Sequence, residues 1–151
     1  YSKSENFIFN SNSELLKTEY SESSLKTHFR KKDNEGRQFR ERIINSKSYK
    51  YYADEGTLLG SVWNDIKSMQ ANSPIMKEYT IYPNQKPISL LTRIISASSN
   101  KGDYILDSYC GSGTSLVAAE KLNRNWIGVD AENQSIETIK LRIMENSFYQ
   151  I

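Results

Sequence analysis

The chain has 151 residues and a hydrophobic fraction of 37%, which fits one domain, or a large part of one, with some segments left open for a partner. Its net charge of +2 says nothing by itself about nucleic acid, whereas its one cysteine, Cys110, excludes an intrachain disulfide and indicates a cytoplasmic protein. No apolar run is long enough to span a bilayer and no signal peptide is visible, so we expect no membrane partner.

The first 80 residues show little regular periodicity and predict an irregular N-terminal segment. The sequence FIFN at residues 7–10 is compatible with a short strand, and residues 11–28 are compatible with one or two short helices. The charged stretch that follows contains Gly36, which indicates a turn.

Positive charge is concentrated between Lys26 and Lys50, where nine Lys or Arg residues accompany three Asp or Glu. The rest of the chain holds 11 basic and 15 acidic residues. Basic side chains with interleaved aromatic residues can bind DNA phosphates, although the same pattern fits a solvated charged surface. The candidate DNA-binding residues are Arg30, Lys31, Lys32, Arg37, Arg40 and Arg42.

The second half of the chain predicts alternating helices and strands. A first helix begins at Pro87, with Leu90, Leu91, Ile94 and Ile95 on one face. The other expected elements are strands over residues 104–110 and 125–130 and helices over residues 115–123 and 131–144. This order, with short connections, predicts a parallel sheet covered by helices, which binds ligands at the carboxyl ends of its strands.

The sequence DSYCGSGTS at residues 107–115 joins the first predicted strand to the helix after it. Gly111 and Gly113 allow a sharp turn and a close approach to a ligand, at which the first N–H groups of the helix point. Asp130 ends the second strand, where a carboxylate can accept both hydroxyls of a ribose or cap the next helix. These features predict a site for a nucleoside cofactor.

Two features distinguish between the candidate cofactors. A dinucleotide site prefers a third glycine where Leu116 stands, and the lysine of a P-loop is absent after the glycines. Asp107 would repel a pyrophosphate and attract an ammonium group. S-adenosylmethionine carries a ribose and an α-ammonium group and lacks phosphate, so the charge pattern favours it.

Two segments resemble a known family: YPNQKPISLLTRII at residues 82–95 and GDYILDSYCGSGTSLVAAEKLNRNWIGVD at residues 102–130. They are similar to the tenth and first motifs of the amino-methylating DNA methyltransferases of the β arrangement. In that arrangement the cofactor motifs lie C-terminal to the catalytic motif. The resemblance is good over most of the chain after residue 50 and loose before it.

The resemblance implies a partial, Rossmann-like α/β methyltransferase core that binds S-adenosylmethionine. It implies methylation of an exocyclic amine in double-stranded DNA, adenine N6 ahead of cytosine N4, within a restriction-modification system and with base flipping. Lys86 is implied as a partner of the cofactor's carboxylate, and Cys110 as a small loop residue, because amino methylation needs no covalent intermediate. The candidate cofactor-binding residues are Lys86, Pro87, Asp107, Tyr109, Cys110, Gly111, Ser112, Gly113, Thr114 and Asp130.

The chain departs from the family in its catalytic motif. That motif is a D/N/S-P-P-Y/F/W tetrapeptide, whereas the three prolines here, Pro74, Pro83 and Pro87, are isolated from one another. We therefore assign no catalytic residue, and no metal site because His28 is the only histidine. We expect a C-terminal fragment, or a chain whose missing strands come from another polypeptide, and no methyl transfer by the isolated chain.

The predicted division assigns residues 1–80 to DNA contact and target recognition and residues 81–151 to binding of S-adenosylmethionine. The implied partners are double-stranded DNA, a restriction subunit or an upstream methyltransferase polypeptide, and a second copy of the chain. Two alternatives stay open. One is a truncated or split methyltransferase that binds cofactor and DNA without transfer, and the other is a methyltransferase that acts on RNA or protein.

Overall fold

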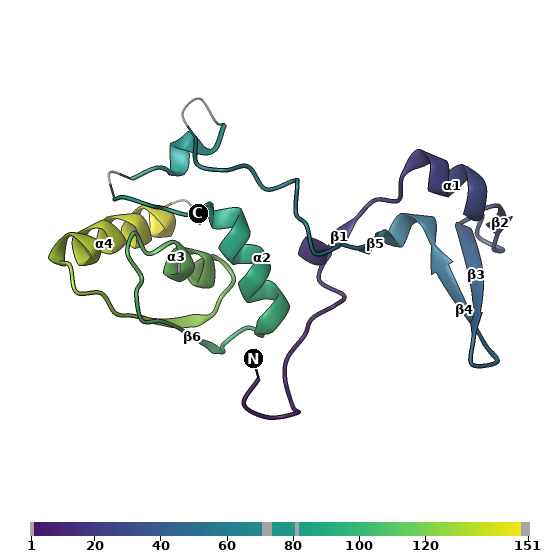
Figure 1. Ribbon diagram of the computed structural model, residues 1–151, viewed down its shortest axis with the longest axis horizontal. Coiled ribbons are helices and arrows are strands. Elements are labelled where there is room, and N and C mark those ends of the chain that lie inside the picture. Colours follow the sequence, from purple (N-terminus) through teal and green to yellow (C-terminus); the bar gives the residue numbers. More distant parts are fainter. Residues whose placement is uncertain (1, 71–73, 81, 149–151) are drawn as a thin grey trace. The chain divides into compact units, whose positions relative to one another are not determined.

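The structure, a computed structural model, describes residues 2–70, 74–80 and 82–148, with side chains as far as Met144. The chain forms two compact units, one of residues 1–15 and 63–151 and the other of residues 16–62 (Figure 1). The functional division expected at residue 80 stays a prediction, because compactness does not show which residues touch DNA or cofactor.

The first unit is a β–α–β arrangement with two further helices. Its strands pair in parallel, with Asp107 opposite Gly128, and both flanking helices pack against the helix that connects the strands. The predicted order and the parallel pairing are confirmed. In chain order the elements are η3 (Pro74–Glu78), α2 (Ile88–Ser98), β6 (Tyr104–Asp107), α3 (Thr114–Lys121), β7 (Asn125–Gly128) and α4 (Asn133–Phe148).

Both strands are shorter than predicted, ending at Asp107 and Gly128 instead of residues 110 and 130. The Asp107 carboxylate accepts a hydrogen bond from the N–H of Tyr109 at 3.1 Å, which turns the chain directly after β6. Helix α4 likewise begins at Asn133, two residues later than predicted, because Asp130 holds the loop before it.

Helix α2 packs through a different stripe from the one predicted. Ile88, Leu91 and Ile95 lie in the core beside α3, whereas Ile94 is exposed. Positions 88, 91 and 95 follow the helical spacing of three and four residues, and small alanines on α3 allow the two helices to approach closely. The helix was therefore predicted correctly and its buried face only in part.

The two-stranded sheet of this unit has one covered face and one bare face. Ile105 and Trp126, which lie opposite each other, pack in the core that contains α3. The bare face carries apolar residues that are each more than half exposed: Tyr104, Leu106, Ile127 and Val129. Parallel sheets normally have both faces covered, so the prediction of a sheet covered by helices is correct for one face of the described structure.

Residues 7–10, expected as a strand, form no regular element. Asn10 instead lies at the carboxyl end of α2, where its backbone N–H donates to the carbonyl of Ala97 at 2.8 Å. Its side-chain amide donates to the carbonyls of Ser96 and Ser99 at 2.9 and 2.8 Å. The last carbonyls of a helix lack partners within the helix, so this segment is fixed by capping instead of strand pairing.

Residues 16–62 form two antiparallel sheets, one of three strands and one of two, with one α-helix, which corrects the prediction of an irregular N-terminal segment. Strands β2, β3 and β4 are neighbours in that order, and β1 pairs with β5. Only Phe39 is buried in β3, so the strand shows no alternation of apolar and polar residues that the sequence could reveal. The elements from the unit boundary onward are η1 (Glu14–Leu16), β1 (Lys17–Thr18), α1 (Glu22–His28), β2 (Lys31–Lys32), β3 (Gln38–Ile44), β4 (Lys47–Tyr52), η2 (Ala53–Glu55) and β5 (Thr57–Leu58).

The short helices expected between residues 11 and 28 are present as η1 and α1. Across the described residues, none of the helices has the length and apolar character that a membrane crossing requires.

Candidate functional site

The glycine turn lies at the carboxyl ends of both parallel strands. The N–H of Cys110 donates to the carbonyl of Val129 at 3.0 Å, which joins the turn after β6 to the residue after β7. The N–H of Gly113 donates to the carbonyl of Cys110 at 2.7 Å and closes the turn just before α3. The topology thus brings Asp107, the turn and Asp130 together, as the sequence predicts for a parallel sheet.

Gly111 and Gly113 both adopt positive φ, at 49° and 71°, but their surroundings differ. A Cβ on Gly111 would lie 3.2 Å from the Tyr82 ring, at the cavity described below. A Cβ on Gly113 would lie 2.4 Å from Cγ1 of Ile139 on α4. Gly111 therefore allows close approach on the ligand side, whereas Gly113 allows close packing of α4.

Leu116, which occupies the position of a third glycine, packs over a glycine on the neighbouring strand. A Cβ on Gly128 would lie 2.4 Å from Cδ1 of Leu116 and 3.1 Å from the sulfur of Cys110. The space for close helix–strand packing thus comes from the strand instead of the helix. A glycine inside a strand often marks such an approach, so Gly128 is the sequence signal for this packing.

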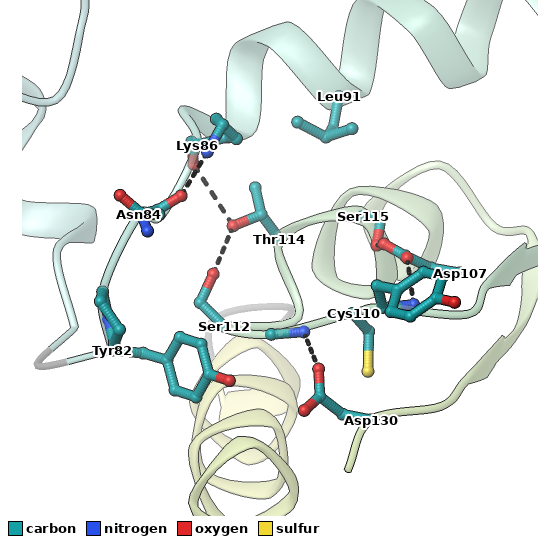
Figure 2. Close-up of a pocket in the computed structure, with 13 residues that line it drawn as sticks. Tyr82, Asn84, Lys86, Leu91, Asp107, Cys110, Ser112, Thr114, Ser115 and Asp130 are labelled. Carbon is teal, nitrogen blue, oxygen red and sulfur yellow. Dashed lines mark hydrogen bonds between the residues drawn. The ribbon is translucent and has the colours of Figure 1, made fainter. Parts of the chain in front are cut away.

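The Asp130 carboxylate joins the two loops of the site (Figure 2). Its Oδ2 accepts from the N–H of Gly111 at 2.7 Å, and its Oδ1 accepts from the N–H of Glu132 at 3.0 Å. These backbone hydrogen bonds lower the pKa of Asp130 below its ordinary value, and the bond from Glu132 has the largest effect. A carboxylate has about four acceptor sites, so Asp130 keeps capacity for ligand hydroxyls. Because α4 begins at Asn133, Asp130 lies ahead of the first turn of that helix.

Asp107 is held in place from two directions. Its Oδ2 accepts a hydrogen bond from the hydroxyl of Ser115 on α3, and its Oδ1 accepts from the N–H of Tyr109. Within the described residues no cation forms an ion pair with this carboxylate, so its charge is neutralised by no side chain. The arrangement leaves a fixed negative charge at the end of β6.

A cavity of about 500 Å³ lies at this edge of the sheet (Figure 2). Its volume falls within the range of small-molecule sites. The predicted residues that line it are Lys86, Asp107, Tyr109, Cys110, Gly111, Ser112, Thr114 and Asp130, whereas Pro87 and Gly113 do not line it. Lining residues that the sequence reasoning missed are Tyr82, Pro83, Asn84, Leu91 and Ser115.

The loop before α2 brings Lys86 to the cavity. Gln85 is buried and makes three hydrogen bonds within the loop. Its Oε1 accepts from the N–H and the hydroxyl of Thr80 at 2.8 Å each, and its side-chain amide donates to the carbonyl of Glu78. The carboxylate of Glu78 accepts the N–H of Ile88 at 3.0 Å and so caps α2, because Pro87 at the N-cap has no side-chain acceptor. The glutamine of the QKP motif thus orders the loop that presents the lysine.

Cys110 is buried with its sulfur 3.9 Å from the hydroxyl of Ser135. Burial raises the pKa of the thiol, and the nearby charges of Asp130 and Asp107 raise it further. Nucleophilic cysteines instead have lowered pKa values. These surroundings agree with the expectation that Cys110 is a small structural residue of the loop.

Two residues of α4 that the sequence reasoning missed hold the glycine turn from behind. Arg142 is buried, and its Nη1 donates to the carbonyl of Ser112 at 2.6 Å and to the hydroxyl of Thr114 at 3.2 Å. The hydroxyl of Ser135 donates to the carbonyl of Gly111 at 2.6 Å. The sequence offered no signal for this role, because a single arginine in an amphipathic helix normally lies in solvent.

The six basic residues predicted to contact DNA have different surroundings. The guanidinium of Arg37 donates to both carboxylate oxygens of Asp54 at 2.9 Å and lies over the Tyr52 ring. The guanidinium of Arg40 lies 5.2–5.4 Å from the centroids of three aromatic rings. Lys31 forms an ion pair with Glu41. The other three are exposed: Arg30, Lys32 and Arg42.

Residues 1–141 match the model of the N6_N4_Mtase family, which is described as DNA methylase. The chain belongs to this family. The match confirms the resemblance that the segments at residues 82–95 and 102–130 indicated.

Relatives of this chain include two type II methyltransferases. M2.DpnII of Streptococcus pneumoniae is 40% identical over 84 residues, which cover 56% of this chain and 31% of that protein. M2.MboI of Moraxella bovis is 43% identical over 92 residues, which cover 57% of this chain and 34% of that protein. The matched segments therefore span about a third of the length of these relatives.

A solved structure similar to this chain is the crystal structure of the M1.HpyAVI–SAM complex. The two share 42% sequence identity over 43% of this chain and 32% of the other, with a TM-score of 0.42. In the part of the chain that the structure describes, no group of three His, Cys, Asp or Glu side chains could hold a metal ion.

Proposed function

We propose that this chain supplies the cofactor-binding part of a type II DNA methyltransferase, which transfers a methyl group from S-adenosylmethionine to an exocyclic amine in double-stranded DNA. The observation that carries the proposal is the cavity formed by the glycine turn, Asp107 and Asp130 at the carboxyl ends of β6 and β7. Membership of the DNA methylase family and similarity to two proteins named type II methyltransferases support it.

The residues of the cavity fit S-adenosylmethionine chemically. Asp107 and Asp130 supply two negative charges beside Gly111, which suits a ligand that carries a cationic sulfonium and an ammonium group and has no phosphate. Lys86 lines the same cavity, and its ammonium, which donates to the carbonyl of Asn84, can turn to receive the carboxylate of the ligand's amino-acid moiety. Pyrophosphate would meet both carboxylates, so a dinucleotide fits less well.

Each residue has a defined role in binding. Asp130 accepts the ribose hydroxyls while the N–H of Gly111 holds its orientation, and Asp107 receives the ammonium while Ser115 fixes its rotamer. The bound cofactor supplies an activated methyl group on sulfur. The chain's own contribution is therefore to hold the donor in place, since orientation provides much of the acceleration of such a transfer.

The finer assignment to adenine N6 rests on the resemblance, in which adenine is the more common target. The base must leave the helical stack before its amine can reach a donor held at the turn, so base flipping accompanies the reaction. A Pro-Pro tetrapeptide, which this sequence lacks, would hold the flipped base. Those residues come from a polypeptide segment outside the printed sequence.

A second candidate function is a non-catalytic methyltransferase fragment that binds cofactor and DNA. The observation in its favour is the absence of any Pro-Pro pair among the 151 residues. A methyl-transfer assay with an added polypeptide that carries the tetrapeptide distinguishes the two functions. A fragment without a catalytic role gains no activity from the added polypeptide.

Isothermal titration calorimetry with S-adenosylmethionine tests the proposal. We expect Asp130→Ala to lose at least one charge-assisted hydrogen bond, about 1.5–3 kcal/mol, and thus about tenfold or more in affinity. Glu132→Ala is the matched control, because it removes a neighbouring exposed carboxylate that does not line the cavity. Equal affinities of the wild type and a folded Asp130→Ala protein would contradict the ribose assignment, and no binding by the wild type would contradict the cofactor site.

A further inference from the structure

Strands β3 and β4 extend as a two-stranded ribbon beyond the rest of their sheet (Figure 1). Strand β2 pairs only with Gln38 and Phe39, at the base of β3. All residues from 41 to 50 are exposed, and we call this segment the ribbon. Asn45 and Ser46 form its two-residue turn with φ of 50° and 61°, the conformation that keeps the natural twist of a hairpin.

The pairing register divides the hairpin into two faces of different charge. Residues directly opposite in an antiparallel pair share a face, so one face carries the pairs Arg40–Tyr51, Arg42–Tyr49 and Ile44–Lys47. This basic face has three cations and no acidic residue. The opposite face contains Glu41, which binds Lys31 and Ser48.

The base of the hairpin packs against aromatic side chains of its unit, whereas the outer part of the basic face is free to contact a partner. The Arg40 guanidinium lies among the rings of Tyr20, Phe29 and Tyr51, at 5.2–5.4 Å from each centroid. Farther out, Arg42 and Lys47 are exposed, and within the described residues neither forms an ion pair. Arg40 thus stabilises the base, while Arg42 and Lys47 present unneutralised charge.

Large apolar groups accompany this charge on the ribbon. On the basic face Ile44 is 45% exposed and Tyr49 is 44% exposed, and on the opposite face Ile43 is 77% exposed. A two-stranded hairpin without packing on either face is only marginally stable in water. Exposed apolar groups flanked by cations therefore indicate a surface that becomes covered by an anionic partner.

We propose that residues 41–50 insert into a groove of duplex DNA, with the basic face of the ribbon directed at the duplex. The major groove of B-DNA is wide enough for a two-stranded ribbon, so Arg42 and Lys47 can reach phosphates along its edges while Tyr49 and Ile44 contact base edges. This inference rests on the proposed function, because it takes DNA as the substrate of the methyltransferase. It assigns the recognition of DNA to a part of the chain other than the cofactor turn.

Fluorescence anisotropy with a labelled mixed-sequence duplex tests the ribbon. We expect Arg42→Ala/Lys47→Ala to lower duplex affinity at least tenfold and to reduce the slope of log K against log salt by about two, because each phosphate contact contributes about 0.9. Ile44→Ser/Tyr49→Ser should lower affinity with an unchanged slope. The matched control, Lys101→Ala/Lys140→Ala, removes two exposed lysines outside the second unit and should change neither quantity.

Photocrosslinking of the unaltered chain to a duplex that contains 5-bromouracil gives a second measurement. We expect the crosslinked peptide to include Tyr49. Three results would each overturn the proposal: both ribbon variants bind duplex as tightly as the wild type, crosslinks form only outside residues 41–50, or the wild type does not bind duplex. Unchanged affinity of both variants is the result expected if the ribbon contacts protein instead of DNA. Titration of S-adenosylmethionine on the same samples reports separately on the proposed function, because no ribbon residue lines the cavity.

Discussion

Gly113 is constrained by helix α4 and not by the ligand cavity. Its φ of 71° belongs to the left-handed region, and a Cβ would overlap the side chain of Ile139. The sequence alone suggested that both glycines of the turn serve a ligand. At the scale of single residues, the fold therefore separates one glycine that borders the cavity from one that fixes packing behind it.

We expect Gly113→Ala to lower the free energy of unfolding by about 2–4 kcal/mol, from left-handed backbone strain together with overpacking. Gly102→Ala is the control, because Gly102 has a φ of 84° but nothing within 4 Å of a Cβ. The control should cost only the backbone strain, about 1–2 kcal/mol. Urea denaturation gives both values, and equal losses in the two variants would show that the contact with Ile139 does not matter.

Cys110 is buried, and we expect it to contribute small size instead of reactivity. We expect Cys110→Ser to keep the affinity for S-adenosylmethionine within a few-fold of the wild type. Burial raises the pKa of the Cys110 thiol, which disfavours a reactive thiolate, and the neighbouring Ser135 offers a hydroxyl partner to the new serine. Calorimetry on the wild type and the variant measures the difference. Complete loss of binding by a folded Cys110→Ser protein would show that the thiol itself is required.

Helix α4 supports the turn through a buried arginine. At the scale of elements, α4 supplies both the apolar contact of Ile139 and the hydrogen bonds of Arg142, so the turn is held between α3 and α4. Hydrogen bonds from a charged donor to buried acceptors are stronger than average and costly to remove. The position of the glycine turn therefore depends on a helix that comes after it in the sequence.

We expect Arg142→Met to lower the free energy of unfolding by about 1.5–3 kcal/mol and to weaken cofactor binding, because the carbonyl of Ser112 loses its donor. The exposed neighbour Lys140 provides the control Lys140→Met, which should change neither quantity measurably. Thermal denaturation and calorimetry provide the two readouts. An Arg142→Met protein with wild-type values for both would remove the positioning role assigned to Arg142.

At the scale of the whole molecule, the proposed cofactor site is local, whereas the two-stranded parallel sheet beside it has one uncovered face. The turn, its supporting helices and both strands are close in sequence, so they form within one unit. One face of β6 and β7, however, exposes Tyr104, Leu106, Ile127 and Val129. Parallel sheets are normally covered on both faces, so these residues form an uncovered apolar surface within the described part of the chain.

We expect purified chain 1–151 to show no methyl transfer to mixed-sequence duplex DNA in a tritiated-methyl assay. Without a Pro-Pro tetrapeptide nothing holds the flipped base, and unstacking costs a few kcal/mol without compensation. Addition of a polypeptide segment that carries the tetrapeptide should restore transfer, and cofactor titration of the same sample serves as the control for folding. Robust, site-specific incorporation by the chain alone would contradict this expectation.

The sequence by itself determined the local features of the site. The strand–turn–helix around Gly111, the partner carboxylate Asp130 and the parallel β–α–β order follow from glycine chemistry and short-range periodicity, and the structure has them. The family resemblance depended on the same contiguous residues, and the family match confirms it.

Only the tertiary structure showed what depends on contacts between distant residues. Gly128 makes room for Leu116, Arg142 holds the turn, Asn10 caps α2, and the hairpin of residues 38–52 forms a ribbon with one basic face. None of these features produces a periodic pattern in the sequence. The first three depend on single residues, and the outer part of the hairpin is exposed on both faces. Packing partners far apart in the chain are decided by the fold as a whole, whereas a turn is decided by the few residues that form it.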